Sequence, residues 1–548
     1  MNLNEITFVN GLPEEERKIL NELLGIWRRK LDNNLKRSDY YNARNKLKDL
    51  GISIPPPLRD VETVVGWPAK AVDCLAVRSR FDGFVCADGE NDLLDRIVDG
   101  NNLKSAYAQA VNSELINSAV VATVSKGNEK GGEPPAIISF YSLVDSAVEW
   151  DRRHKRVKYG LTIIDSKRID NTEEERPVWV NLYTDTAVWE IKRNDDGTWT
   201  SRKNPHNMGR PMLVALRYRP TLERPFGKSR ISKAVRSITD SAVREALRSE
   251  VSAEFFTAPQ KYLLGADDTV FDDESKWDAY IGTIFAVSKD EEGDIPHFGQ
   301  LSQGSMQPHT EYMRTLAARF SGETAVPVSE LGVVSDNPSS AEAIYAAKES
   351  LVIEAEHLNE INGDALKIVA KMALASAKGI ALSDLDDNDR SVEPRFKNPA
   401  RPSIVSQADA ISKIIAALPW VAESEVPLEE FGFNEDQITR LRNDKRKAEA
   451  KSLILQQQQQ SAQSEHTATM YEMSSILKSY VSGKITRKSA IALFAKIGIE
   501  EDEANQLLDD AEDNPDSVTD VIEQSPTADA SEGVTIDADT GAGGANLL

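Results

Sequence analysis

The stretch NPSSAEAIYAAKESLVIEAE, residues 337–356, begins a helix that is unusually long for a globular protein. Pro338 breaks the preceding chain, and Ser339 with a glutamate three residues later forms a capping box, the pattern of a helix N-terminus. Apolar or small residues then recur at intervals of three, four and once seven up to Gly379, which predicts about 40 residues of helix, or roughly 60 Å. Such a helix either crosses a large assembly or forms a coiled coil, and Gly363 in mid-course suggests a bend.

The composition indicates a globular chain of several structural regions. The chain has 548 residues, of which 40% are hydrophobic, and its formal charge is −23, from 65 Lys and Arg against 88 Asp and Glu. A protein that grips nucleic acid electrostatically normally shows the opposite balance, so DNA near this protein is expected to slide past rather than be held.

The cysteines and the hydropathy indicate the cellular compartment in which the protein is expected to fold. Cys74 and Cys86 form no CxxC pair, which predicts two buried thiols rather than a disulfide framework or a zinc site. The amphipathic helix expected over Glu14–Leu31 lacks the apolar core and cleavage site of a signal peptide, and no run of 18 apolar residues occurs. We therefore expect no transmembrane helix and a reducing cytosol.

The fold class predicted from periodicity is α+β. Residues 13–50 are predicted helical, and from Ala136 to Pro220 the apolar period changes to two, which predicts an antiparallel sheet with a hairpin at Asp196-Gly197. Helix returns afterwards. The further predicted elements are helices at 228–257, 308–321, 404–418 and 434–455, a strand at 392–396, a low-complexity glutamine join at 456–460, a helical hairpin at 468–512 and an acidic disordered tail at 513–548.

Motifs for catalysis or cofactor binding are incomplete. FGKS at 226–229 follows a strand and opens a helix, but it lacks the first glycine of GxxxxGK[ST], and Pro225 has no amide hydrogen to offer a phosphate, so a helix start near Ser229 is the better account. The acidic stretch 384–395 lacks the glycine and glutamate of a calcium loop. No HExxH, GxSxG or Cys/His pairing occurs, so we expect no enzyme, no cofactor and no metal, although dispersed carboxylates could converge in space.

Two basic clusters leave alternatives open. RRHKR at 152–156 is expected in a turn between strands, and RLRNDKRKAEAK at 440–451 lies on a helix interleaved with acids. Each is interpreted as a solvated face or an inter-subunit salt-bridge surface, with DNA contact as the competing interpretation.

Four segments, taken in order, resemble the portal proteins of tailed bacteriophages, particularly those of siphophages. SDYYNARNKLKDLGI (38–52) is similar to the family's N-terminal "YY.G...L" segment, with Asn42 and Ala43 in place of its usual glycine. The resemblance spans about residues 38–455, and it rests on order and spacing rather than on one diagnostic motif. The other similar segments are VGWPAKAVDCLAVRSRFDGFV (65–85), PHNMGRPMLVALRYRP (205–220), and the pair FGKSRISKAVRSITDSAVREALRSE with NPSSAEAIYAAKESL, separated by a clip-like insert.

The resemblance implies a ring of twelve copies at one capsid vertex, with a channel that passes double-stranded DNA during packaging and ejection. It implies no catalytic activity, location in the virion after assembly in the host cytoplasm, and no membrane. The implied partners are the terminase large subunit, a head-tail adaptor, the major capsid and scaffolding proteins, and DNA bound without sequence specificity. The implied domains are N-terminal helices and wing sheet (1–227), stem helix 1 (228–257), clip (258–307), stem helix 2 (308–322), tunnel loop (323–338), long channel-to-wing helix (339–379), wing strand (380–403), helical crown (404–512) and acidic tail (513–548).

Candidate contact residues follow from these assignments. The tunnel loop carries little positive charge, so its predicted DNA contacts are Val333, Val334, Ser335 and Asn337, with Lys348 on the following helix able to reach the channel or a neighbour. A stem helix in a ring touches neighbours on both sides and should carry apolar residues on more than one face, although a monomer's buried helix would look similar. The predicted inter-subunit residues of the stem are Ile231, Val235, Ile238, Arg244, Leu247 and Arg248.

Two other classes of function compete with this interpretation. A filament-forming or capsid-scaffolding protein would use the long helix in coiled coils, but heptads do not continue cleanly past Asn362. A nucleotide-dependent motor subunit would use the FGKS helix start.

Overall fold

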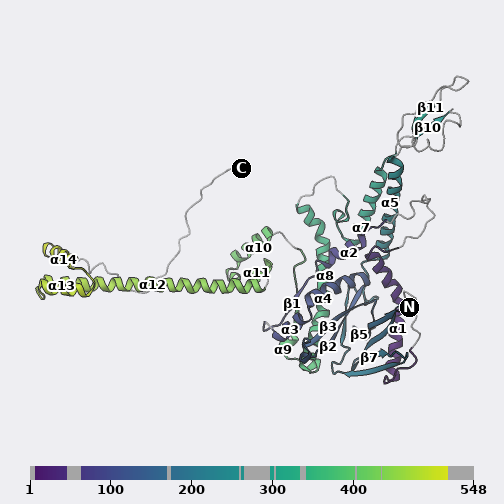
Figure 1. Ribbon diagram of the computed structural model, residues 1–548, viewed down its shortest axis with the longest axis horizontal. Coiled ribbons are helices and arrows are strands. Elements are labelled where there is room, and N and C mark those ends of the chain that lie inside the picture. Colours follow the sequence, from purple (N-terminus) through teal and green to yellow (C-terminus); the bar gives the residue numbers. More distant parts are fainter. Residues whose placement is uncertain are drawn as a thin grey trace. The chain divides into compact units, whose positions relative to one another are not determined.

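The computed structural model describes residues 6–45, 63–89, 91–168, 175–257, 261–264, 297–300, 304–333, 341–400, 404–433 and 435–515. The chain forms two compact units that divide between residues 401 and 402 (Figure 1). The first unit combines helices with antiparallel sheets, and the described part of the second is helical, which confirms the α+β class. Among the described residues, no helix is both long enough and apolar enough to cross a membrane.

A five-stranded antiparallel sheet packs against the first helix. Its strand order is β4-β5-β6-β7-β8. Leu161, Val180 and Ile191 lie in the apolar core between this sheet and α1. Trp27 of α1 donates its indole N–H to the Val144 carbonyl at 2.6 Å. The predicted hairpin is confirmed, because the β7–β8 turn carries Gly197 at φ +87°. The bounds are α1 Glu14–Tyr41, β4 Ser146–Asp151, β5 Arg156–Arg168, β6 Glu175–Tyr183, β7 Ala187–Arg193 and β8 Trp199–Pro205.

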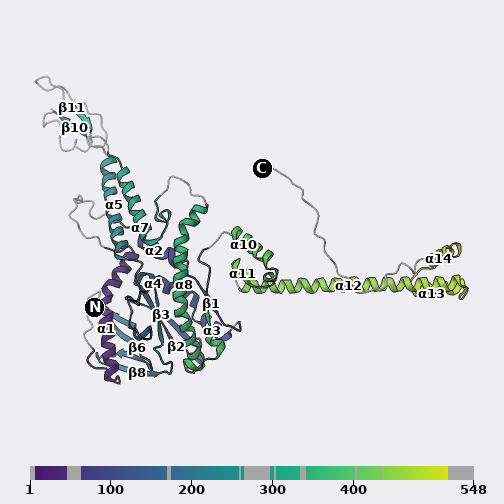
Figure 2. The same ribbon diagram turned by 180° about the vertical axis from the view of Figure 1, so that it is seen from behind.

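A second, three-stranded sheet of order β3-β2-β9 forms the centre of the unit and contacts α4 and α8 (Figure 2). β2 reads AVVATVSK, and its first six residues are buried, as expected for a strand covered on both faces. The bounds are α2 Trp67–Ala76, β1 Phe81–Val85, α3 Asp92–Gly100, α4 Leu103–Asn117, β2 Ala119–Lys126, β3 Ala136–Ser142 and β9 Leu213–Arg217.

The long helix predicted at the outset is α8, Ala341–Lys378, whose 38 residues extend about 57 Å. Its glycine lies where another element comes close: a Cβ on Gly363 would lie 3.4 Å from Pro394 Cγ and 3.5 Å from Phe396 Cε2, both in β12. These are ordinary van der Waals distances, so a methyl group would fit there and packing does not require glycine; the bend stays a prediction. The predicted strand at 392–396 is confirmed as β12, Glu393–Phe396, which pairs antiparallel with β1, and α9, Asp387–Arg390, precedes it.

Two helices, α5 (Lys233–Thr257) and α7 (Gln307–Thr324), lie side by side (Figures 1 and 2). Between them in sequence, β10 (Lys261–Leu264) pairs antiparallel with β11 (His297–Gln300). The predicted helix start at 228 is wrong, because Lys228 and Arg230 donate their backbone N–H groups to Tyr218 and Leu115 carbonyls. Ser232, rather than Ser229, then accepts the Val235 N–H at the helix start, at 3.2 Å.

The second unit is built on one helix, α12 (Glu435–Val481), of 47 residues. The predicted join at the glutamine run 456–460 is wrong, because the helix continues through it: glutamine is a good helix former, and no Gly or Pro occurs from 435 to 481. At its end, Phe494 and Leu508 of two short helices complete a small apolar core with α12. The remaining bounds are α10 Ile404–Ala417, α11 Val426–Glu430, α13 Arg487–Lys496 and α14 Glu501–Asp513.

Candidate functional site

A buried arginine joins four elements where α5, α7 and α8 meet. Arg230, just before α5, donates to the Tyr218 hydroxyl at 2.8 Å, to the Thr324 carbonyl at 2.6 Å and to the Ala71 carbonyl. Its guanidinium also lies 2.7 Å from Glu354 of α8. We call Arg230, Tyr218 and Glu354 the Arg230 cluster. Because Thr324 ends α7 and Arg230 directly precedes α5, the cluster ties the long helix α8 to both of these helices, and the bond to Ala71 adds α2.

The electrostatics of the Arg230 cluster are those of a buried, hydrogen-bonded ion pair. Arg230 is 5% exposed and Glu354 8%, and Tyr218 donates its hydroxyl hydrogen to Glu354. Burial raises the pKa of Tyr218 to about 12; the charge of Arg230 opposes that rise and the charge of Glu354 adds to it. Arg219, half-exposed, approaches Glu354 at 3.0 Å from the outside. Such a pair is costly to break, because each remaining charge would be buried without its partner.

Helix α2 holds the start of the segment that follows α7. The Trp67 indole N–H donates to the Leu331 carbonyl at 3.1 Å, and its ring packs on Phe320 of α7 at 5.4 Å between centroids. Leu331 ends a short 3₁₀ turn, Val328–Leu331. The first residues after α7 are therefore fixed on α2.

One partly exposed carboxylate in that turn is shared by two lysines. Glu330 Oε1 lies 3.4 Å from Lys348 Nζ of α8, and its Oε2 lies 3.7 Å from Lys70 Nζ of α2. We call these three residues the Glu330 triad. Sequence reasoning missed Lys70, because its position 260 residues before Glu330 gives no local signal.

A buried acid lies where α4 faces α8. Asn362 donates to Glu114 Oε2 at 2.8 Å and to the Tyr107 hydroxyl at 3.1 Å, and Ser79 lies 2.9 Å from the same hydroxyl. Glu114 is 0% exposed, and burial raises its pKa to about 8, with the Asn362 bond and the charge of Arg217 lowering it. Glu114 therefore carries a proton at neutral pH.

The FGKS segment does not form a phosphate loop. Gly227, at φ +73°, sits where a Cβ would lie 2.0 Å from the Tyr218 carbonyl oxygen. Its N–H donates to the Arg224 carbonyl at 2.9 Å, the Lys228 N–H donates to the Tyr218 carbonyl at 2.9 Å, and the Ser229 hydroxyl donates to the Ile116 carbonyl at 2.5 Å. These donors are bonded to carbonyls of the fold and do not point at a ligand. The segment therefore connects β9 to α5 and is held against the end of α4 and the residue after β9.

The other candidate motifs form local contacts. In the acidic stretch 384–395, Asp386 caps α9 and accepts from Lys378 at 3.1 Å, and Lys378 also pairs with Asp389. The cluster 152–156 lies in the β4–β5 turn as predicted. Across the residues that the structure describes, no group of three or more His, Cys, Asp or Glu side chains is placed to hold a metal.

The Cys86 side chain is buried and the Cys74 side chain is partly buried, and neither forms a disulfide.

Residues 20–451 match the family described as "Phage portal protein, SPP1 Gp6-like". The chain belongs to the phage portal protein family. The "Portal protein" of Mycobacterium phage D29 is 26% identical over 416 residues, which cover 72% of this chain and 82% of that protein. The "Portal protein" of Mycobacterium phage L5 is 27% identical over 391 residues, which cover 69% of this chain and 77% of that protein.

Solved structures also resemble the portal protein at low identity. A chain from "Virion of native gene transfer agent (GTA) particle" has a TM-score of 0.40 at 14% identity and covers 73% of this chain and 94% of its own. A chain from "Neck of native GTA particle computed with C12 symmetry" has a TM-score of 0.39 at 13% identity and covers 73% and 94%.

The predicted channel residues of the portal protein fall in two groups. Val333 is partly buried against the core of its own chain, and Lys348 belongs to the Glu330 triad. Val334, Ser335 and Asn337 lie outside the described residues. A role in DNA contact stays a prediction for all five.

The predicted stem residues also divide. Ile231, Val235 and Ile238 are 1%, 1% and 6% exposed and pack in the core of their own chain. Their side chains leave little surface for a neighbouring subunit, so the prediction of lateral contacts now rests on Arg244, Leu247 and Arg248, which reach the surface of α5.

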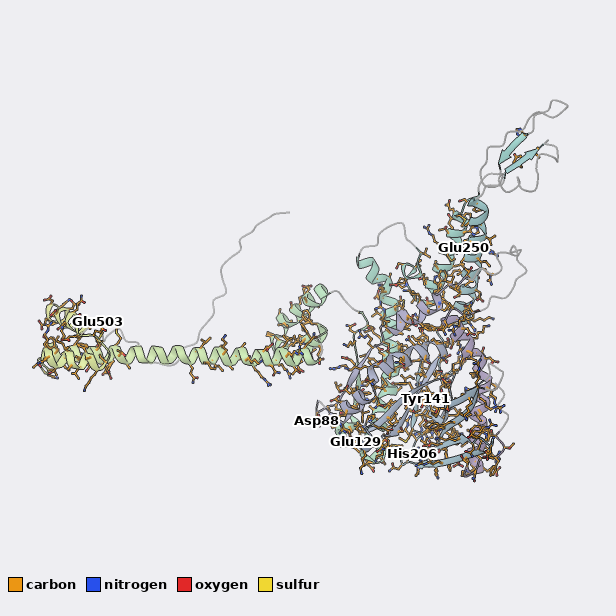
Figure 3. The ribbon with its side chains drawn as sticks, viewed as in Figure 1. Asp88, Glu129, Tyr141, His206, Glu250 and Glu503 are labelled. Carbon is orange, nitrogen blue, oxygen red and sulfur yellow. The ribbon has the colours of Figure 1, made fainter. Side chains whose placement is uncertain are left out.

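Between α5 and α7, a carboxylate of α5 bonds to a histidine of α7. Glu245, 4% exposed, lies 2.6 Å from His309 Nδ1 and 3.4 Å from Arg248. Near the end of α5, Glu250 is exposed, as the side-chain view shows (Figure 3). The two helices are thus joined by polar contacts in their interface and are charged on their outer faces.

Proposed function

We propose that this portal protein assembles into a ring of twelve copies at one capsid vertex and forms the channel through which double-stranded DNA is packaged and ejected. The family match over residues 20–451 carries the proposal. It is supported by the order of elements in the first unit: sheet, paired helices α5 and α7 with β10 and β11 between them in sequence, a short segment, then the 38-residue helix α8.

The elements take the following roles in this proposal. The sheets and N-terminal helices form the wing, α5 and α7 the stem, residues 258–307 the clip, residues 323–338 the tunnel loop, and unit 2 the crown. The Arg230 cluster supports this division, because its bonds join Ala71, Tyr218, Thr324 and Glu354, which lie in or beside the wing, stem and long helix. DNA would pass the tunnel loop without sequence-specific contacts.

In this proposal the protein forms a channel for DNA and catalyses no reaction itself, so it acts with other proteins of the phage. The clip would face the terminase large subunit during packaging and a head-tail adaptor afterwards, and the wing would face the major capsid and scaffolding proteins. Assembly would occur in the host cytoplasm and the product would reside in the virion. Net charge of −23 suits passage of DNA, because an acidic wall keeps any single phosphate contact weak.

Mass photometry of the purified full chain, with negative-stain imaging, tests the proposal. The expected result is a ring with a central hole and a mass of about twelve times 60.5 kDa. A monomer or small dimer that persists across salt and protein concentration would contradict self-assembly into a ring. Filaments would favour the scaffolding alternative.

A further inference from the structure

The start of the tunnel loop is poor in positive charge, and the cations beside it are already paired. Residues 323–338 contain no Lys or Arg. The lysines at its base come from other elements, Lys70 from α2 and Lys348 from α8, and both contact Glu330. A passing phosphate would therefore meet two ammonium groups that already share a counter-ion.

The geometry of the Glu330 triad resembles what a phosphodiester would make there. A carboxylate and a phosphodiester are both monoanions with two equivalent oxygens, and the ammonium of lysine binds either as a point charge. In the triad, each oxygen of Glu330 faces a different lysine, at 3.4 and 3.7 Å.

The triad is also accessible enough to exchange partners. The side chains of Lys70, Glu330 and Lys348 are 52%, 35% and 34% exposed. Ion pairs exposed to this degree are weak, because water and salt screen them. DNA carries a negative charge about every 1.7 Å along its axis, so phosphates at high local density would compete for the same two lysines.

We propose that Glu330 competes with DNA phosphates for Lys70 and Lys348 at the base of the tunnel loop and thereby limits the grip of the portal on DNA. The inference rests on the proposed function, since it places the triad in the channel. DNA binding there requires a lysine to leave Glu330, and the carboxylate takes the lysine back when the phosphate moves on. Each contact is thus kept short-lived.

The experiment measures binding of assembled rings to a short linear duplex of mixed sequence across a series of NaCl concentrations. Glu330→Gln keeps the shape and removes the competing charge, so we expect tighter binding and a log–log salt slope steeper by about 1 for each lysine that gains a phosphate. Adding Lys70→Gln and Lys348→Gln to that variant should return the slope to the wild-type value. Glu349→Gln, which removes the same charge from the next residue of α8, should leave the slope unchanged.

Three outcomes would overturn the inference. The first is an equal change in salt slope for Glu330→Gln and Glu349→Gln. The second is a gain in DNA affinity that remains after both lysine substitutions, and the third is an equal gain in affinity for a covalently closed DNA minicircle. The minicircle cannot thread a closed ring, so a gain there would place the lysines outside the channel. If the Glu330→Gln variant does not assemble, Glu330→Asp is used instead. Aspartate is one methylene shorter, so its carboxylate lies farther from the two lysines. Imaging of each variant separates the two proposals: absence of rings in wild type contradicts the proposed function, whereas rings with an unchanged salt slope contradict only this inference.

Discussion

Replacing the buried acid Glu114 by glutamine should stabilise the protein more at pH 8 than at pH 5. Burial raises the pKa of Glu114 from 4.5 to about 8, although the Asn362 hydrogen bond and Arg217 lower it. The folded chain therefore keeps this proton up to about pH 8, while the unfolded chain releases it near pH 4.5. Between these values the unfolded state binds fewer protons, so the contribution of Glu114 to stability falls as pH rises.

The size of this effect follows from the two pKa values. At about 1.4 kcal/mol per pKa unit, Glu114 lowers the free energy of unfolding by about 1 kcal/mol at pH 5 and about 4 kcal/mol at pH 8. Glutamine has no charge to bury, and its side-chain oxygen can accept from Asn362 Nδ2 as Glu114 Oε2 does at 2.8 Å. The advantage of Glu114→Gln should thus grow by about 3 kcal/mol from pH 5 to pH 8, or about 3–4 °C in Tm if the first unit, Met1–Arg401, unfolds cooperatively with about 2.1 cal/mol/K of unfolding entropy per residue.

Thermal unfolding followed by tryptophan fluorescence at pH 5, 6.5 and 8 measures this difference. Glu129→Gln is the matched control, because Glu129 is an exposed carboxylate paired with Arg96 on the surface (Figure 3). Its Tm difference from wild type should change little with pH. A Tm difference for Glu114→Gln that is the same at all three pH values would refute the reasoning, because Glu114 would then not be protonated in the fold.

Three further substitutions test the contacts that join the elements. Glu354→Gln should lower stability by about 3 kcal/mol, because Arg230 then lies buried opposite a neutral amide; an unchanged Tm would contradict the account of a buried ion pair. Trp67→Phe keeps most of the ring but leaves the Leu331 carbonyl without its donor, so amide exchange at the 3₁₀ turn should quicken by the equivalent of about 1–2 kcal/mol; unchanged protection there would show that α2 does not hold the turn. Tyr40→Phe removes the one hydroxyl hydrogen that Tyr40 shares between the two carboxylate oxygens of Asp240 in α5, at 2.8 and 3.0 Å, and should cost about 1.5–3 kcal/mol in denaturant unfolding; a loss under 0.5 kcal/mol would contradict it.

Two matched controls accompany these variants. Arg219→Gln removes the half-exposed neighbour of the Arg230 cluster and should cost under about 1 kcal/mol, as surface pairs do. Tyr41→Phe removes the corresponding bond to Asp73 of α2, at 2.9 Å, and so separates the contact with α5 from that with α2. Together they test whether the burial of the bonded groups sets the free-energy cost of losing the contact.

Elements with a local signal could be predicted from the sequence. The apolar spacing locates α8, and the Asp196-Gly197 pair locates the β7–β8 turn, whereas Ser339 of the predicted capping box lies outside the described residues. The two adjacent tyrosines that carried part of the family resemblance now have a physical role: Tyr40 bonds to Asp240 of α5, and Tyr41 bonds to Asp73 of α2. Their partners lie on different helices, so the pair fixes the end of α1 against both.

Contacts between distant residues could not be predicted. The Arg230 cluster joins positions up to 159 residues apart, and neither spacing nor composition indicates that Ala71, Tyr218 and Glu354 surround one guanidinium. The start of α5 was misplaced for the same reason. Residues before Lys233 have helical propensity, but the strand-end carbonyl of Tyr218 takes the Lys228 N–H. Tertiary hydrogen bonds overrode the local pattern there.

The start of the proposed tunnel loop combines a buried contact set with a partly exposed one, and the two sets differ in whether their bonds can exchange. The Arg230 cluster adds little net stability over an apolar core of the same shape, yet breaking it leaves uncompensated buried charges, so it holds α5, α7 and α8 in one arrangement. The Glu330 triad is only partly buried and weakly paired, so its ion pairs are expected to exchange without movement of those helices. Under the proposed function, DNA that passes residues 323–338 would therefore exchange contacts at the triad while the junction of α5, α7 and α8 remains intact. On this argument, a rearrangement of the loop during packaging would begin at the Glu330 triad, and one that broke the Arg230 cluster would have to separate the stem from α8.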